Sequence, residues 1–223
     1  MWNEFNIKTF PAETIVYRDG NFCPELSTIS NNKIETKYDL PVHIIYVGEI
    51  AGKKELKIEI NVENQPVFLS VNIKNKKSAI FDIFIKNAGK NSVLKGHIFI
   101  ENFKDINFTV KADYFKENTG ILLNTKLICH KKTYSKLTGI ADIGTNCPGC
   151  ISDISFSAIT DEEAKIEFLP IQRIKSEPKS ADHSASIYRQ TPVQIQYLRM
   201  AGLSTEEIRN IAYESFKNEY SLF

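Results

Sequence analysis

Cys147 and Cys150 form the clearest chemical motif of the sequence, the C-x-x-C tetrapeptide Cys147-Pro148-Gly149-Cys150. Two thiolates at this spacing can chelate one metal ion or form a redox pair. A zinc site would need a second such pair or nearby histidines, and a thioredoxin-type site would need a βαβ context. The sequence has neither at the usual spacing. Proline and glycine between the cysteines favour a plain turn between two strands, with a metal, cluster or redox role as the alternative.

His183 differs from the other histidines because it follows the predicted strands and directly precedes the predicted helices. A neutral imidazole at such a place can bind a metal ion or relay a proton. Cys129-His130 ends a predicted strand, and Cys129 could supply a further ligand, although a lone cysteine is more often a small buried side chain. His43 and His97 lie within predicted strands, where a histidine on the polar face is the simpler interpretation.

Nucleotide, nucleic-acid and membrane binding find no support in the sequence. It contains no G-x-x-x-x-G-K-[ST] and no G-x-G-x-x-G, so we expect no nucleotide to bind this chain. With 28 Lys and Arg against 27 Asp and Glu, the net charge of +1 gives no general attraction to nucleic acid or to an anionic membrane. Apolar stretches are too short to cross a bilayer, and the first residues do not resemble a signal peptide. We therefore expect a cytoplasmic protein whose four cysteines are thiols.

The elements that position these residues change character near residue 180. Before it, apolar residues recur with period two, as in Leu56, Ile58, Ile60 and Val62, which is typical of strands. Regularly spaced strands without intervening helices fit a sandwich, a barrel or a β-helix. The predicted strands are Glu13–Arg18, Val42–Val47, Leu56–Val62, Val67–Ile73, Ala79–Lys86, Val93–Glu101, Ile106–Ala112, Gly120–Ile128, Lys136–Ile143, Cys150–Ile159 and Lys165–Ile171.

Two short helices are predicted at the C-terminus. Thr191 is placed to cap the first helix, with Pro192 at its first position and Gln194 completing a capping box. Gly202 ends this helix. Ser204 and Glu207 form a second capping box that begins the next helix. Between strands and helices, Ile174–Tyr188 is interpreted as a polar connection.

The C-terminal part of the chain also carries residues with a familiar spacing. Ala181-Asp182-His183-Ser184-Ala185-Ser186 precedes a Q-x-x-Y-L-x-x-x-G-L-S pattern that starts at Gln194, and Leu169-Pro170-Ile171 lies upstream. Together with Gly139–Ile143, these residues resemble the end of the core of the SufB/SufD family, the scaffold components of the SUF iron–sulfur cluster assembly system. The resemblance is specific over residues 134–216 and collinear before them.

The resemblance implies a mainly β protein, a right-handed parallel β-helix of stacked coils with a small C-terminal helical hairpin. It also implies a non-enzymatic scaffold that pairs with a SufB/SufD-like β-helix or with itself. A SufC-like ABC-type ATPase would dock on the helices, and we expect Gln196, Tyr197, Arg199 and Met200 to form that contact. The implied division is an N-terminal segment 1–40, a β-helix core 41–175 and a C-terminal helical segment 176–223.

The residues that would handle a transient iron–sulfur cluster match the family only in part. His183 corresponds to a histidine implicated in cluster assembly, and we expect it to act as an iron or cluster ligand. The essential cysteine of SufB corresponds to Ser155, whose hydroxyl is a poor ligand for iron or sulfur. Cys147 and Cys150 are candidate ligands only by proximity in sequence. The alternatives are a β-rich binding module without cluster chemistry and a Cys/His metal-dependent enzyme.

Overall fold

The computed structural model describes residues 13–18, 21–27, 42–50, 55–62, 66–160 and 163–218. Most of the predicted N-terminal segment 1–40 therefore lies outside the described residues. The strands are β1 (Glu13–Arg18), β2 (Asn21–Phe22), β3 (Val42–Ile50), β4 (Glu55–Val62), β5 (Val67–Asn75), β6 (Ala79–Asn87), β7 (Val93–Asn102), β8 (Ile106–Tyr114), β9 (Gly120–Cys129), β10 (Tyr134–Ile143), β11 (Ile151–Thr160), β12 (Lys165–Ile174) and β13 (Ser180–Tyr188). The helices are the 3₁₀ turn η2 (Pro24–Leu26), α1 (Pro192–Met200) and α2 (Thr205–Asn218).

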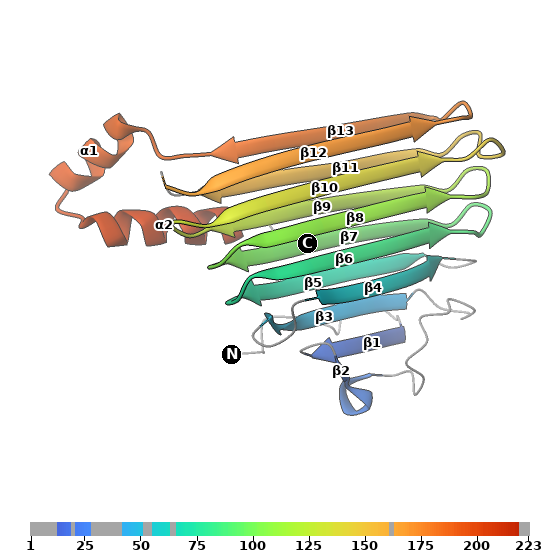
Figure 1. The fold of residues 1–223 in the computed structure, drawn as a ribbon, viewed down its shortest axis with the longest axis horizontal. Helices are drawn as coiled ribbons and strands as arrows, with labels where there is room; N and C mark the ends of the chain where they lie inside the picture. Colours follow the sequence, from blue (N-terminus) through green and yellow to red (C-terminus); the bar gives the residue numbers. More distant parts are fainter. Residues whose placement is uncertain are drawn as a thin grey trace.

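These strands wind into a parallel β-solenoid of about five turns, which confirms the predicted β-helix (Figure 1). The odd-numbered strands form one sheet in the order β13-β11-β9-β7-β5-β3-β1, with β2 pairing antiparallel to β1 at its edge. The even-numbered strands form a second sheet in the order β12-β10-β8-β6-β4. Each coil therefore gives one strand to each sheet and places it directly against the same strand of the coil before.

The core lies between the two sheets, and alternation within each strand determines which side chains enter it. In β6, β8 and β10, every second residue is buried, whereas the residues between them are partly or fully exposed. Pairing in register places buried residues above one another in columns, such as Leu69, Gly96, Leu123 and Ile154. The predicted strands of period two are confirmed, apart from shifts of a few residues at their ends.

Polar side chains also stack inside the solenoid, at the corner where β5 and β7 end. Asn75 Nδ2 donates to Asn102 Oδ1 at 2.6 Å, and Asn102 Nδ2 donates to Ser135 Oγ at 2.7 Å. Cys129 lies opposite Asn102 in the next coil, and its sulfur is 3.3 Å from Ser135 Oγ. Buried amides of this kind need partners, and the neighbouring coils supply them. Cys129 therefore continues a structural column.

The interpretation of Ile174–Tyr188 as a polar connection is wrong, because Ser180–Tyr188 forms β13. This strand pairs in parallel with β11, with Ile151 opposite Ser180 and Ile159 opposite Tyr188. The alternation was hard to see because the residues in register with the core positions of β11 include two alanines and His183. The solenoid thus extends past residue 175 to Tyr188.

Both C-terminal helices begin as predicted, and α1 also ends as predicted. Thr191 and Gln194 form the capping box of α1, and Gly202 has φ +90° just beyond its end. Ser204 and Glu207 cap α2, with Glu207 N donating to Ser204 Oγ at 3.3 Å. The hydrogen bonds from Ser204 lower the pKa of Glu207. These caps account for the abrupt turn between the two helices.

The helix α2 packs on the outer face of the odd-strand sheet, near the ends of its strands (Figure 1). Tyr213 and Phe216 are buried there against Ile128 and Ile159. Lys126, itself buried, donates to the carbonyl oxygen of Phe216 at 2.7 Å and lies over the Phe216 ring. A cation at the C-terminal end of a helix satisfies an otherwise unpaired carbonyl group.

Replacement of Gly139 by alanine will test how closely the two sheets are packed across the core. A Cβ atom at Gly139 would lie 2.7 Å from Cε2 of Phe156, so the ring would have to move. We expect Gly139→Ala to lower the free energy of unfolding by about 1–3 kcal/mol, measured by urea unfolding.

Gly120→Ala is the matched control, because its Cβ atom would lie no closer than 3.4 Å to a heavy atom of Val93. Alanine lowers the conformational entropy of the unfolded chain relative to glycine. We therefore expect Gly120→Ala to be neutral or slightly stabilising. Equal destabilisation by the two variants would contradict the packing described here.

Candidate functional site

The last coil, formed by β12 and β13, leaves the interior of the solenoid uncovered. In the described part of the chain, each of these strands is the edge of its sheet. Ile174 lies in register with buried Ile143, and Ile187 with buried Ala158, so both continue core columns. Ile174 is nevertheless 45% exposed and Ile187 47% exposed, because no further described strand covers them.

The two open edges differ in how well they could pair with another strand. β12 contains Pro170, which has no N–H group to donate and is tolerated at a sheet edge. β13 has the sequence SADHSASIY, with neither proline nor lysine. Edge strands are commonly protected from pairing by such residues. β13 is therefore the edge whose backbone is better suited to accept a partner strand.

His183 lies in the middle of β13, in register with Ile154 of β11. Because Ile154 is buried in the core, the His183 side chain occupies the final place of an interior column. Its Nε2 atom is buried and has no hydrogen-bond partner among the described residues. Burial lowers the pKa of His183, against the opposing effect of Asp153 and Asp182. A neutral imidazole with a free nitrogen results, which is the form that binds metal ions.

Asp153 and Asp182 lie opposite each other on β11 and β13, one residue before the Ile154–His183 pair. Burial raises the pKa of Asp153, the charge of Asp182 raises it further, and His183 lowers it. Sequence reasoning missed this pair, because its signal is the register between two strands and the second strand was not predicted.

Cys147 and Cys150 lie in the turn between β10 and β11, and the predicted turn is confirmed. Gly149 has φ +71°, and a Cβ atom there would collide with Oδ1 of Asn118. Both thiols are free and point inward, with 1% and 0% of their surfaces exposed. Cys147 Sγ donates to the carbonyl of Tyr114 at 3.1 Å, and Cys150 Sγ donates to that of Lys116 at 3.3 Å.

The described residues contain no group of three or more His, Cys, Asp or Glu side chains placed to hold a metal ion. His183 lies on β13, and the two cysteines lie in the turn that precedes β11. Ser155, which the resemblance aligns with the SufB cysteine, lies opposite Ser184 and donates to the carbonyl of Leu123 at 3.2 Å.

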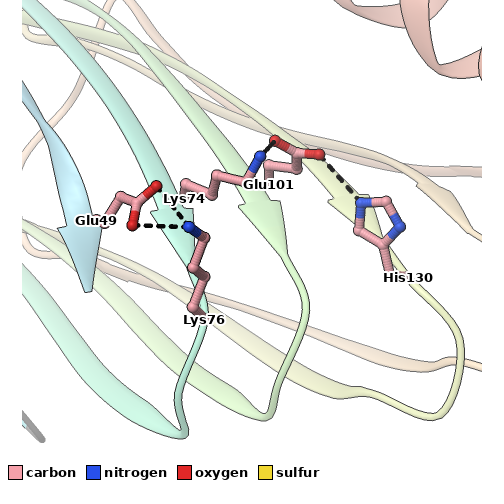
Figure 2. Close-up of polar contacts among 5 residues, drawn as sticks. All are labelled: Glu49, Lys74, Lys76, Glu101 and His130. Atoms are coloured by element: carbon pink, nitrogen blue, oxygen red, sulfur yellow. Dashed lines mark hydrogen bonds and ion pairs between the residues drawn. The ribbon is translucent and has the colours of Figure 1, made fainter. Parts of the chain in front are cut away.

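The other histidines lie away from the last coil, and His130 packs against neighbouring side chains. Figure 2 shows Glu101 between Lys74 and His130: Lys74 Nζ is 3.3 Å and His130 Nε2 is 3.2 Å from its carboxylate oxygens. The His130 ring stacks on Phe103 and meets the edge of Tyr213 of α2. His97 is exposed on β7, as predicted, and the side chain of His43 lies outside the described residues.

The four residues expected to contact a partner are all exposed on α1. Tyr197 is 72% exposed and Met200 is 82% exposed, and Gln196 and Arg199 also face solvent. None of the residues of α1 is buried. Arg199 donates to Thr205 Oγ1 at 2.8 Å, which joins α1 to the start of α2. Large apolar side chains of α1 are therefore exposed to solvent.

A scan against protein-family models gave no match, and a search of curated proteins also found no matching sequence. The resemblance to the SufB/SufD family therefore rests on the residues quoted above. Among the described residues, neither helix is long and apolar enough to cross a membrane.

Replacement of Glu101 by glutamine will measure the ionic contribution of the contacts in Figure 2. The hydrogen bond from His130, together with Lys74, holds the pKa of Glu101 below its usual value despite burial. A carboxyl group whose pKa is lower in the folded state stabilises the fold above its unfolded pKa. We expect Glu101→Gln to cost about 0.5–1.5 kcal/mol at neutral pH, measured by urea unfolding. The difference from the wild type should shrink as the pH falls below about 4.

Glu49→Gln is the control for this measurement, because Glu49 forms an exposed ion pair with Lys76 at 2.8 Å (Figure 2). Exposed pairs contribute about 0–1 kcal/mol. A loss for Glu101→Gln that is the same at pH 3 and pH 7 would show that its charge does not stabilise the fold.

Proposed function

We propose that this protein is a non-enzymatic scaffold subunit of a SUF-type iron–sulfur cluster assembly complex in the cytoplasm. In this proposal, a second β-helix, either SufB/SufD-like or another copy of this chain, pairs with the last coil. A SufC-like ABC-type ATPase binds α1. The open edge of β13 supports the proposal most strongly, since it combines a strand without proline or lysine, the exposed interior residue Ile187 and His183.

The chemistry of the last coil suits an interface between two solenoids. Ile174 and Ile187 lose their exposed apolar surface only if something covers the end of the solenoid, and burial of apolar surface drives association. A strand from the partner would also satisfy the free backbone groups of β13. If the partner is a second copy related by two-fold symmetry, the two β13 strands would run antiparallel.

His183 would meet the partner at this interface, where the cluster is cargo and not a permanent cofactor. Its unpartnered Nε2 atom supplies one neutral nitrogen ligand, and thiolates of the partner are suited to complete the coordination of iron. Asp153 and Asp182 lie beside it and favour a nearby cation. Ser155 contributes no thiolate, so the partner rather than this chain would accept the sulfur.

The surface of α1 supports docking of a protein partner. Val193, Tyr197 and Met200 are each more than 70% exposed. Tyrosine and methionine are enriched in protein interfaces, where they bury large areas at small entropic cost. ATP hydrolysis would then belong to the partner, in agreement with the absence of phosphate-binding motifs from this sequence.

Anaerobic purification of the tagged chain from its native cells, with mass spectrometry of the copurifying proteins, tests the whole proposal. Recovery of an ABC-type ATPase, with or without a second β-helix protein, would support it. Recovery of the chain with neither would contradict it and leave a β-rich binding module without cluster chemistry.

Tyr197→Ala tests the docking role of α1 with the purified ATPase. We expect affinity for the ATPase to fall about 10- to 30-fold, because an exposed tyrosine at the centre of an interface contributes about 1.5–2 kcal/mol. Phe115→Ala is the control, since Phe115 is a similarly exposed aromatic residue in the turn after β8. Unchanged binding of Tyr197→Ala would remove this residue from the interface.

Ile187→Lys tests the pairing of the last coil. A lysine at this interior position would put a charge into the buried contact, so we expect dimer or heterodimer affinity to fall at least about tenfold in sedimentation velocity. Phe115→Lys adds the same charge away from the last coil and should leave pairing intact. Pairing that survives Ile187→Lys, with the fold intact by circular dichroism, would show that the solenoids meet elsewhere.

A further inference from the structure

The dithiol turn, which comprises Cys147, Pro148, Gly149 and Cys150, brings two sulfur atoms to one corner of the solenoid. Cys147 Sγ and Cys150 Sγ contact the carbonyls of Tyr114 and Lys116, which are two residues apart in the neighbouring coil. Cys150 Sγ is also 3.2 Å from Thr119 Oγ1. The two thiols interact with each other directly. Both sulfur atoms are therefore placed to share one ligand.

Backbone groups of the dithiol turn offset part of the cost of negative charge on the Cys147 sulfur. The backbone at Gly144 and Asn146 lowers the pKa of the Cys147 thiol. Burial and the neighbouring Cys150 thiol outweigh this effect and raise the pKa of Cys147. Without a cation, the Cys147 thiol therefore stays protonated. A bound cation would remove this penalty by neutralising charge inside the site.

Neighbouring coils hold the dithiol turn in place from both sides. Asn118 N donates to the carbonyl of Pro148 at 2.9 Å, and Gly149 N donates to that of Glu177 at 2.9 Å. A site fixed in this way loses little entropy when a ligand binds. Thr145, Asn146 and Pro148 are exposed, so the sulfur atoms lie directly beneath the surface of the turn. A small ion would need only a local shift of the turn to reach them.

The number of ligands decides which metal ion fits. Structural zinc takes four ligands, and the described residues offer no set of three suitable side chains. Soft thiolate ligands select Cu(I), for which two sulfur atoms are sufficient. We propose that Cys147 and Cys150 form a two-thiolate site for a monovalent soft metal ion of the Cu(I) type. Two S–H bonds break, two metal–sulfur bonds form, two protons leave to solvent, and no electron is transferred.

Anaerobic titration of the reduced full-length chain with Cu(I), in competition with a chromophoric Cu(I) chelator, tests this site independently of the proposed scaffold function. We expect one Cu(I) ion to bind per chain with the ultraviolet absorption of a copper–thiolate bond. Because binding releases protons from the thiols, affinity for Cu(I) should rise with pH.

Cys147→Ser and Cys150→Ser should each abolish this binding, whereas Cys129→Ser should retain it. Cys129 is the matched control because it is also fully buried but lies at another corner, against Ser135. If the first two variants fail to fold, X-ray absorption of the wild-type complex still decides the question. Two sulfur ligands at copper and binding retained in Cys129→Ser support the site. Nitrogen or oxygen coordination, or binding retained without Cys147, overturns it.

Discussion

Parallel pairing in register between successive coils is the interaction on which the rest of the molecule depends. Each odd-numbered strand from β3 onward and each even-numbered strand from β6 onward pairs with the strand one coil earlier, so each side chain lies above its equivalent in that coil. A residue in the core must therefore fit the residues above and below it. This constraint selects Asn102 beside Asn75, where each buried amide needs a polar neighbour. Residues that face each other across the core must fit as well: Phe156 of β11 can enter the core only because Gly139 of β10 faces its ring without a side chain.

In-register stacking can continue from one coil to the next without a built-in end. The last coil therefore has interior residues that no further coil covers. The interior columns continue into β12 and β13, yet Ile174 and Ile187 remain about half exposed. Solenoids generally need a distinct cap at each end to keep the terminal coil from associating. In the described chain, α2 covers the outer face of the odd-strand sheet and leaves the end of the column that contains His183 open. The exposed end is thus a property of how the fold terminates.

Much of this architecture could be predicted from the sequence, because local signals specify it. Period-two alternation predicted most strands, and Thr191 and Ser204 predicted where the helices begin. β13 escaped prediction because its identity depends on β11, to which it pairs, and its own residues alternate only weakly. For the same reason, the proximity of Asp153 to Asp182 and the interior position of His183 could not be predicted. Periodicity alone also left the sandwich, the barrel and the β-helix open, since all three have strands that alternate.

The two C-terminal helices differ in their contacts: α2 packs on the coils, whereas α1 packs on α2. α2 is joined to three successive coils, through Lys126 of β9, Ile159 of β11 and Tyr188 of β13. α1 packs on α2 and buries none of its own residues. Displacement of α2 would expose Tyr213 and Phe216 and leave the buried Lys126 ammonium group without the Phe216 carbonyl. In the proposed complex, a partner that displaced α1 would act through α2 on the coils next to the open edge, because these contacts join the two surfaces.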